Sequence, residues 1–111
     1  MSDVEKLFQS WREHIKEYAK AAADYEYLSE YRKSKKAILM GEALTQGEEK
    51  ANAQERYAYS HHEYLALLDG IRAAREKAEE LRWRMKLAEH RVGAWQTGEA
   101  NARAEFKKYG N

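Results

Sequence analysis

Apolar residues recur at alternating spacings of four and three along the first part of the chain. The members of this series are Val4, Phe8, Trp11, Ile15, Tyr18, Ala22 and Tyr25. Such spacing places every member on one face of an α-helix. Nothing breaks the pattern strongly before residues 45–47. We therefore predict a first helix over residues 3–44, about 60 Å long at 1.5 Å per residue.

A second series of the same kind runs through the last third of the chain. Its members are Ile71, Ala74, Ala78, Leu81, Met85, Ala88, Val92 and Trp95, followed by Ala102, Phe106 and Tyr109. Gly70 stands just before this series and Gly93 and Gly98 lie within it, and each glycine weakens a helix by about 1 kcal/mol relative to alanine. No proline accompanies these glycines. The spacing predicts one helix over residues 60–108.

Two serine–glutamate pairs mark where the long helices begin. Ser2 stands three residues before Glu5, and Ser60 stands three residues before Glu63. In such a capping box the serine oxygen accepts a backbone N–H while the glutamate reaches back. The second box predicts that His61 and the residue after it occupy the first helical positions.

Residues 45–59 connect the two long helices and favour a short helix near 48–59. The chain is therefore expected to be all-α. We predict a single domain over residues 1–111, a long antiparallel helical hairpin of coiled-coil type with a short connecting helix. One apolar seam gives a chain of this size marginal stability. Because further apolar residues lie off the main stripes, we expect a homodimer that forms a helical bundle.

The composition agrees with long helices in a folded protein. Charged residues make up 35% of the chain and aromatic residues 12%, with neither proline nor cysteine. The aromatic content argues against disorder. The absence of cysteine excludes disulfides and thiolate metal sites, and it fits a reducing cytoplasm. No segment approaches the roughly 18 consecutive apolar residues that a membrane span needs, so we expect no membrane partner.

The motifs of common metal and catalytic sites do not occur. The residues three before each of the four histidines are never glutamate, and His-Glu-x-x-His is missing. Adjacent residues of a helix point about 100° apart, so His61 and His62 are poorly placed to share a metal ion. There is no glycine-rich phosphate loop. We expect no enzyme activity, no cofactor and no metal.

Basic residues gather in two short segments, 32–36 and 82–86. Such patches bind phosphates, and an aromatic ring among the cations, here Trp83, stacks on a base. The other interpretation is that these cations pair with glutamates on solvated helix faces. The net charge of +1 favours pairing. Direct nucleic-acid binding stays an alternative, with the candidate residues Arg32, Lys33, Lys35, Lys36, Arg72, Arg75, Arg82, Arg84 and Lys86.

Tyrosine is abundant, with eight residues in 111. Tyrosine, tryptophan and arginine are enriched among the residues that dominate binding energy at protein interfaces. Half of the tyrosines are explained by core-facing positions with their hydroxyl groups at the rim. The candidate partner-binding residues are Tyr27, Tyr31, Arg32, Tyr57, Tyr59 and Trp83.

A resemblance to a known family rests on the strings LSEYRKSKKAILM, AQERYAYSHHEYLALLDGIRAAREKAEELRWRMKLAEHRVGAWQT and ANARAEF. Over residues 4–106 the chain resembles small helical proteins encoded by bacteriophages and prophages. Their genes often lie beside recombination genes for annealing proteins and exonucleases. The resemblance implies a phage origin and proximity to nucleic-acid metabolism, and it assigns no catalytic residue. In that family a proline follows the Ser-His pair, whereas His62 stands there in this chain.

These features predict a non-enzymatic interaction protein that binds a DNA-processing protein or nucleoprotein complex of the host or phage. Two roles fit. One is inhibition of a host nuclease or CRISPR effector, as an anti-CRISPR-like protein, and the other is an accessory role in phage recombination. The alternatives are direct nucleic-acid binding and a structural coiled-coil spacer. The expected location is the cytoplasm of an infected or lysogenic bacterial host.

Overall fold

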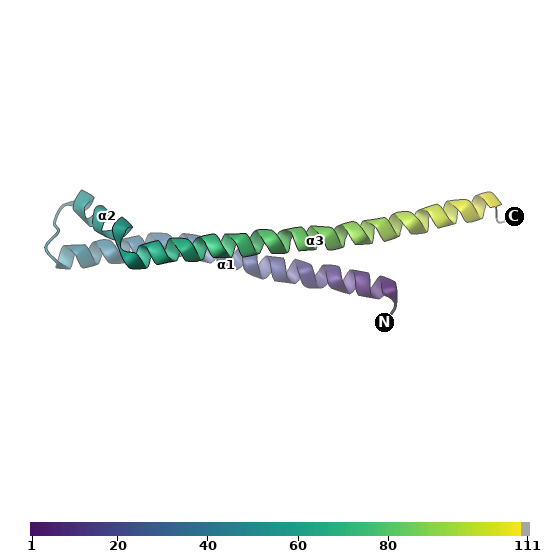
Figure 1. The fold of residues 1–111 in the computed structure, drawn as a ribbon, viewed down its shortest axis with the longest axis horizontal. Coiled ribbons are helices and arrows are strands. Elements are labelled where there is room, and N and C mark those ends of the chain that lie inside the picture. Colours follow the sequence, from purple (N-terminus) through teal and green to yellow (C-terminus); the bar gives the residue numbers. More distant parts are fainter. Residues whose placement is uncertain (110–111) are drawn as a thin grey trace. The chain divides into compact units, whose positions relative to one another are not determined.

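The computed structural model describes residues 1–109 and contains three α-helices (Figure 1). They are α1 (Asp3–Thr45), α2 (Ala51–Ser60) and α3 (His62–Tyr109). The part of the chain that the structure describes contains no β-strand. The predicted all-α helical hairpin with a short connecting helix is therefore confirmed. The homodimer stays a prediction.

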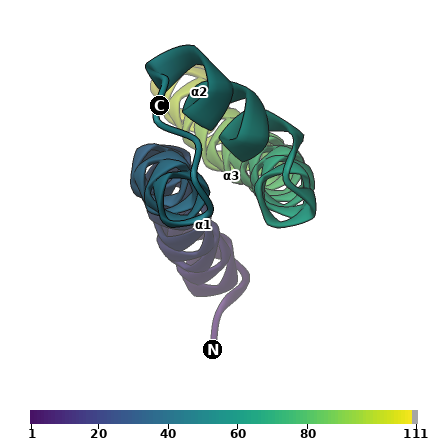
Figure 2. The ribbon, with the colours of Figure 1, turned by 90° about the vertical axis from the view of Figure 1, so that its left-hand side faces the viewer.

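The chain divides into two compact units, each containing one segment of α1 and one of α3. Unit 1 consists of Met1–Ala19 and Glu79–Asn111. Unit 2 is Lys20–Ala78, and it includes the whole of α2. Figure 2 views α2 and the turns on either side of it, which link the end of α1 to the start of α3.

The N-terminus of α1 has the predicted capping box. The Glu5 amide donates a hydrogen bond to Ser2 Oγ at 3.2 Å, and the Ser2 amide donates to Glu5 Oε2 at 3.4 Å. Each bond satisfies a backbone N–H that has no partner within the helix. The two acidic residues of the first turn also face the positive end of the helix dipole.

The C-terminus of α1 is a Schellman motif built on Gly47. The Glu48 amide donates to the Ala43 carbonyl at 3.0 Å, and the Gly47 amide donates to the Leu44 carbonyl at 3.1 Å. This pattern needs a left-handed residue directly after the C-cap residue, here Gln46, and Gly47 has a φ of 101°. Glycine adopts this conformation without the steric penalty of a Cβ atom, which explains why α1 ends here.

The predicted second capping box is wrong. Ser60 is the last residue of α2, and its hydroxyl donates to the Arg56 carbonyl at 2.7 Å. His61 has extended backbone angles, with φ −68° and ψ 136°, and it caps α3 instead. Its Nδ1 accepts the Glu63 amide at 3.0 Å. An imidazole nitrogen thus takes the role expected of the serine oxygen, because α2 continues through residue 60.

The core of unit 2 forms where α2 packs against both long helices. Leu39 and Ala58 are 0% exposed and Tyr64 is 6% exposed, so one residue from each helix contributes to a single cluster. Met40 and Tyr57 pack against this cluster from its edge. Burying a leucine side chain completely stabilises a fold by about 1.5–3 kcal/mol relative to leaving it in water. The short helix therefore completes a core that α1 and α3 share.

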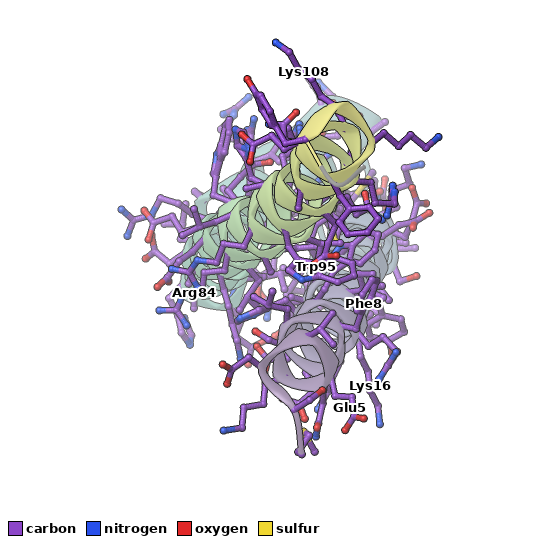
Figure 3. The ribbon with its side chains drawn as sticks, turned by 90° about the vertical axis from the view of Figure 1, so that its right-hand side faces the viewer. Glu5, Phe8, Lys16, Arg84, Trp95 and Lys108 are labelled. Carbon is purple, nitrogen blue, oxygen red and sulfur yellow. The ribbon has the colours of Figure 1, made fainter. Side chains whose placement is uncertain are left out.

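Unit 1 is held by a seam between one segment of α1 and one of α3. Phe8 and Trp95 face one another edge to face, with ring centroids 6.0 Å apart (Figure 3). Ile15, which the sequence places on the inner stripe, is 40% exposed, whereas the neighbouring His14 is half-buried. Because adjacent residues point about 100° apart, only one of the two can face α3 at this turn. The expectation for Ile15 is corrected accordingly.

Candidate interaction surfaces

Trp83 is the centre of an exposed surface on the α3 segment of unit 1. Its side chain is 61% exposed, and Leu87, one turn further along, is 54% exposed. The Arg82 guanidinium carbon lies 5.3 Å and Lys86 Nζ 5.4 Å from the Trp83 ring centroid. We call Trp83, Leu87, Arg82 and Lys86 the tryptophan surface.

Glutamates on the same helix balance part of the charge of this surface. Arg82 lies 3.6 Å from Glu79, and Arg84 lies 2.6 Å from Glu80. Both are pairs within one helix, three and four residues apart. Exposed pairs of this kind contribute only about 0.3–0.5 kcal/mol to helix stability. Their consequence here is electrostatic, because they reduce the positive potential that a polyanion would meet around Trp83.

The basic cluster at 32–36 is largely engaged with other parts of unit 2. Lys35 Nζ donates to Glu63 at 2.7 Å, and its side chain is only 19% exposed. This hydrogen bond raises the pKa of Lys35 and lowers that of Glu63. The contact joins α1 to the first turn of α3.

Lys36 joins α1 to α2 in a similar way. Its ammonium lies 3.4 Å from Glu55 and 4.7 Å from the Tyr59 ring centroid. The contact with Tyr59 and the charge of Glu55 raise the pKa of Lys36. Lys33 pairs with Glu30 of its own helix at 3.2 Å, while Arg32 is exposed. Three of the four cations at 32–36 thus have a carboxylate partner.

The remaining nucleic-acid candidates lie on α3. Arg72 is 3.8 Å from Asp69 of the same helix, and both side chains are more than 70% exposed. Arg75 is exposed as well. These two residues belong to unit 2, whereas Arg82, Arg84 and Lys86 belong to unit 1.

The tyrosines proposed as partner-binding residues fall into two groups. Tyr27 and Tyr31 stack on the surface of α1, with ring centroids 6.4 Å apart and planes within 11°. Tyr57 is half-buried, its hydroxyl accepts a hydrogen bond from Gln46 at 3.3 Å, and burial raises its pKa. Tyr59 packs edge to face on Tyr64 at 5.4 Å. Tyr27 and Tyr31 are therefore surface residues, whereas Tyr57 and Tyr59 join α2 to the residues beside it, with Tyr59 still 46% exposed.

An apolar groove lies beside the stacked tyrosines within unit 2. It has a volume of about 320 Å³ and is lined by Ala21, Asp24, Tyr27, Leu28, Ala74 and Lys77. We call it the tyrosine groove. The small side chains of Ala21 and Ala74 leave the hollow, and charged residues of opposite sign stand at its edges. The groove has no signature in the amino-acid sequence, because small side chains form a hollow only once the register of α1 against α3 is fixed.

The paired histidines serve the helix junction. Their rings stack with centroids 4.5 Å apart, while His61 Nδ1 is occupied by the Glu63 amide. Among residues 1–109 no group of three or more His, Cys, Asp or Glu residues is arranged to hold a metal ion.

Comparison with known proteins identifies no relative of this chain. No protein family, curated protein or solved structure matches the chain. None of the helices described here is both long enough and apolar enough to cross a membrane. The class of the protein rests on its fold: the described residues form an all-α helical hairpin.

Proposed function

We propose that this protein is a non-enzymatic binding protein whose tryptophan surface docks onto a protein complex that processes DNA. The outward position of Trp83 and Leu87 carries the proposal, because they are 61% and 54% exposed on one side of α3. The indole of Trp83 and the isobutyl group of Leu87 expose apolar surface to water, and removing that surface from water against a partner is favourable. Tryptophan and arginine are also among the residues that contribute most binding energy at interfaces.

The chemistry of this surface specifies the partner's complementary site. Trp83 and Leu87 fit an apolar pocket, and the ammonium of Lys86 beside the ring fits a carboxylate at the pocket's edge. Burial of the indole between partner atoms strengthens the cation–π contacts of Arg82 and Lys86, because such contacts gain when they are desolvated. The partner is therefore a protein surface with an acidic rim.

The resemblance to phage proteins encoded beside recombination genes supports a DNA-processing complex as the partner. Two roles follow from such binding. The protein inhibits a host nuclease or CRISPR effector, or it acts as an accessory factor in phage recombination. Both roles place the protein in the cytoplasm of an infected or lysogenic bacterium.

Direct nucleic-acid binding is the second candidate function, favoured by the cations on either side of Trp83. A base could stack on the ring while Arg82 and Lys86 contact phosphates. The pairing of Arg82 with Glu79 and of Arg84 with Glu80 disfavours it, because the glutamates would repel the phosphates. This candidate predicts binding that falls steeply with salt.

The test is capture of partners by tagged protein from lysates of phage-infected and uninfected bacteria, each with and without added nuclease. Captured proteins are identified by mass spectrometry. The variant Trp83→Ala/Leu87→Ala is compared with Leu65→Ala, which removes another exposed leucine of α3 (49% exposed). We expect the double variant to lose capture by about tenfold or more and Leu65→Ala to retain it.

The identity of the captured proteins separates the two roles. A host nuclease or CRISPR effector that survives nuclease treatment indicates an inhibitor, and phage recombination proteins indicate an accessory factor. Capture that disappears with nuclease supports direct nucleic-acid binding instead. Equal capture by the double variant would exclude the tryptophan surface as the docking site.

A further inference from the structure

The C-terminal part of α3 carries an apolar line without a partner in the described chain. Residues 96–109 are all exposed, and we call them the α3 tail. Within it Phe106 is 73% and Tyr109 is 75% exposed. These side chains continue the spacing that packs against α1 further back in α3. The tail therefore has the pattern of a helix seam but not the burial.

The α3 tail combines a projecting ring with a hollow beside it. The hollow has a volume of about 380 Å³ and is lined by Ala102, Arg103, Phe106 and Lys107. The tyrosine groove has the same plan, because Tyr27, 69% exposed, stands beside the hollow at Ala21 and Ala74. Each surface thus offers one projecting ring and one open depression beside it, which is the arrangement that interlocking helices need.

The charges at the edges of the two surfaces are complementary. On the tail, Arg103 and Lys107 lie on one side of Phe106 and Glu105 lies on the other, at about 100° per residue. At the groove, Asp24 stands on the α1 edge and Lys77 on the α3 edge. Within residues 1–109 no ion pair involves any of these five side chains.

We propose that the α3 tail of a second copy of this chain occupies the tyrosine groove. Phe106 enters the hollow between Ala21 and Ala74, and Tyr27 enters the hollow beside Ala102. Arg103 and Lys107 then face Asp24, while Glu105 faces Lys77. Ala74 and Phe106 belong to the same continuous helix α3, so the contact joins two molecules. This self-association is independent of the tryptophan surface.

The first test measures the mass of the full chain by sedimentation over concentrations from about 1 µM to about 1 mM. We expect concentration-dependent association that Phe106→Ala weakens by about tenfold, as loss of a central aromatic anchor does at interfaces. Trp83→Ala is the control and leaves association unchanged. A chain that stays monomeric throughout this range overturns the proposal, as does association that Phe106→Ala does not weaken.

A charge exchange tests the orientation of the tail in the groove. Lys77→Glu and Glu105→Lys each place like charges opposite one another and weaken association by about fivefold or more. The double variant Lys77→Glu/Glu105→Lys restores the attraction and regains most of the lost association. Failure of the double variant to recover, with helix content unchanged by circular dichroism, contradicts this orientation.

A matched pair of variants distinguishes a specific contact of the α3 tail from a general effect of its net charge. Lys107 lines the hollow beside Phe106, whereas Lys108 lies about 200° around the helix from Phe106. Both side chains change the net charge equally when replaced by glutamate. We expect Lys107→Glu to weaken association and Lys108→Glu to leave it within about twofold. Equal effects would indicate a general charge effect and overturn the proposed contact.

Discussion

Unit 2 encloses a leucine completely, whereas unit 1 buries none of its three tryptophans. Leu39 in unit 2 is 0% exposed. In unit 1, Trp11 is half-buried, Trp95 is 36% exposed and Trp83 is 61% exposed. Unit 1 does bury small aliphatic side chains of α3, with Val92 at 3% and Ala88 at 4% exposed, but its large aromatic side chains stay partly in water and its described residues include no third helix to cover them. Two helices meet along a line that leaves its edges open to water, and α2 closes one edge in unit 2.

The difference also separates stability from binding. The cluster of Leu39, Ala58 and Tyr64 brings distant parts of the sequence into one core. The open edges of unit 1 leave aromatic and aliphatic groups available to a partner, with Trp83 as the clearest case. We therefore expect substitutions in the core of unit 2 to unfold the protein and substitutions on the tryptophan surface to affect binding.

The largest expected effect comes from removing the enclosed side chain of unit 2. We predict that Leu39→Ala lowers the free energy of unfolding by about 2–5 kcal/mol, because truncating this enclosed side chain leaves a cavity that water does not fill. Ile38→Ala is the matched control, because Ile38 is 57% exposed and its truncation should change stability by about 0.5 kcal/mol. Urea unfolding followed by circular dichroism measures both. Equal losses would mean that α2 does not close the core.

A smaller effect is expected at the open seam of unit 1. The contact between Phe8 and Trp95 should give a coupling energy of about 0.5–1.5 kcal/mol in a double-mutant cycle with alanine. The same cycle on Phe8 and Trp83 is the control, and its coupling should be near zero because Trp83 faces outward. Coupling that is equal in both cycles would contradict the edge-to-face contact.

The smallest effect concerns the ion pair of Lys35 and Glu63. The pKa of Glu63 is lowered from 4.5, so its contribution is complete above that value and disappears as the pH falls through the folded-state pKa. The pKa of Lys35 is raised from 10.5, so its contribution is lost only when the pH rises beyond that value. We predict that Glu63→Gln destabilises the protein near neutral pH and that this difference narrows below pH 4.5.

The measurement for this pair is urea unfolding of both proteins across the acid range. Glu30→Gln serves as the control, because its partner Lys33 lies on the same helix and both side chains are about two-thirds exposed. That variant should differ little from the parent at any pH. If the difference in the free energy of unfolding between the parent and Glu63→Gln stays constant with pH, the carboxylate charge is not involved.

Local patterns were enough to predict the helical fold and the start of α1. The capping box at Ser2 and Glu5 forms because its hydrogen bonds join residues three positions apart. The same pattern at Ser60 misled, because the serine hydroxyl found the Arg56 carbonyl of α2 and His61 became the cap. Both outcomes use local bonds, and only the length of α2 distinguishes them.

The candidate sites depended more on long-range contacts than the helices did. The run at 32–36 reads as a basic patch, yet Lys35 and Lys36 reach Glu63 and Glu55 on other helices. Tyr57 and Tyr59 read as surface residues of α2, yet Tyr57 is half-buried against Gln46 and Tyr59, though 46% exposed, packs edge to face on Tyr64. Trp83 was predicted as a partner-binding residue from its place off the apolar stripe, and the structure leaves it exposed.

The sequence by itself determined the helices, because apolar spacing and the first cap act over a few residues. Tertiary structure decided which faces are covered, since that depends on how α1, α2 and α3 align. Leu39 is enclosed because Ala58 and Tyr64 meet it from far along the chain, whereas Ile38, one residue earlier, stays in water. A difference of about 100° around one helix separates a core side chain from a surface one, and only the neighbouring helices set which is which.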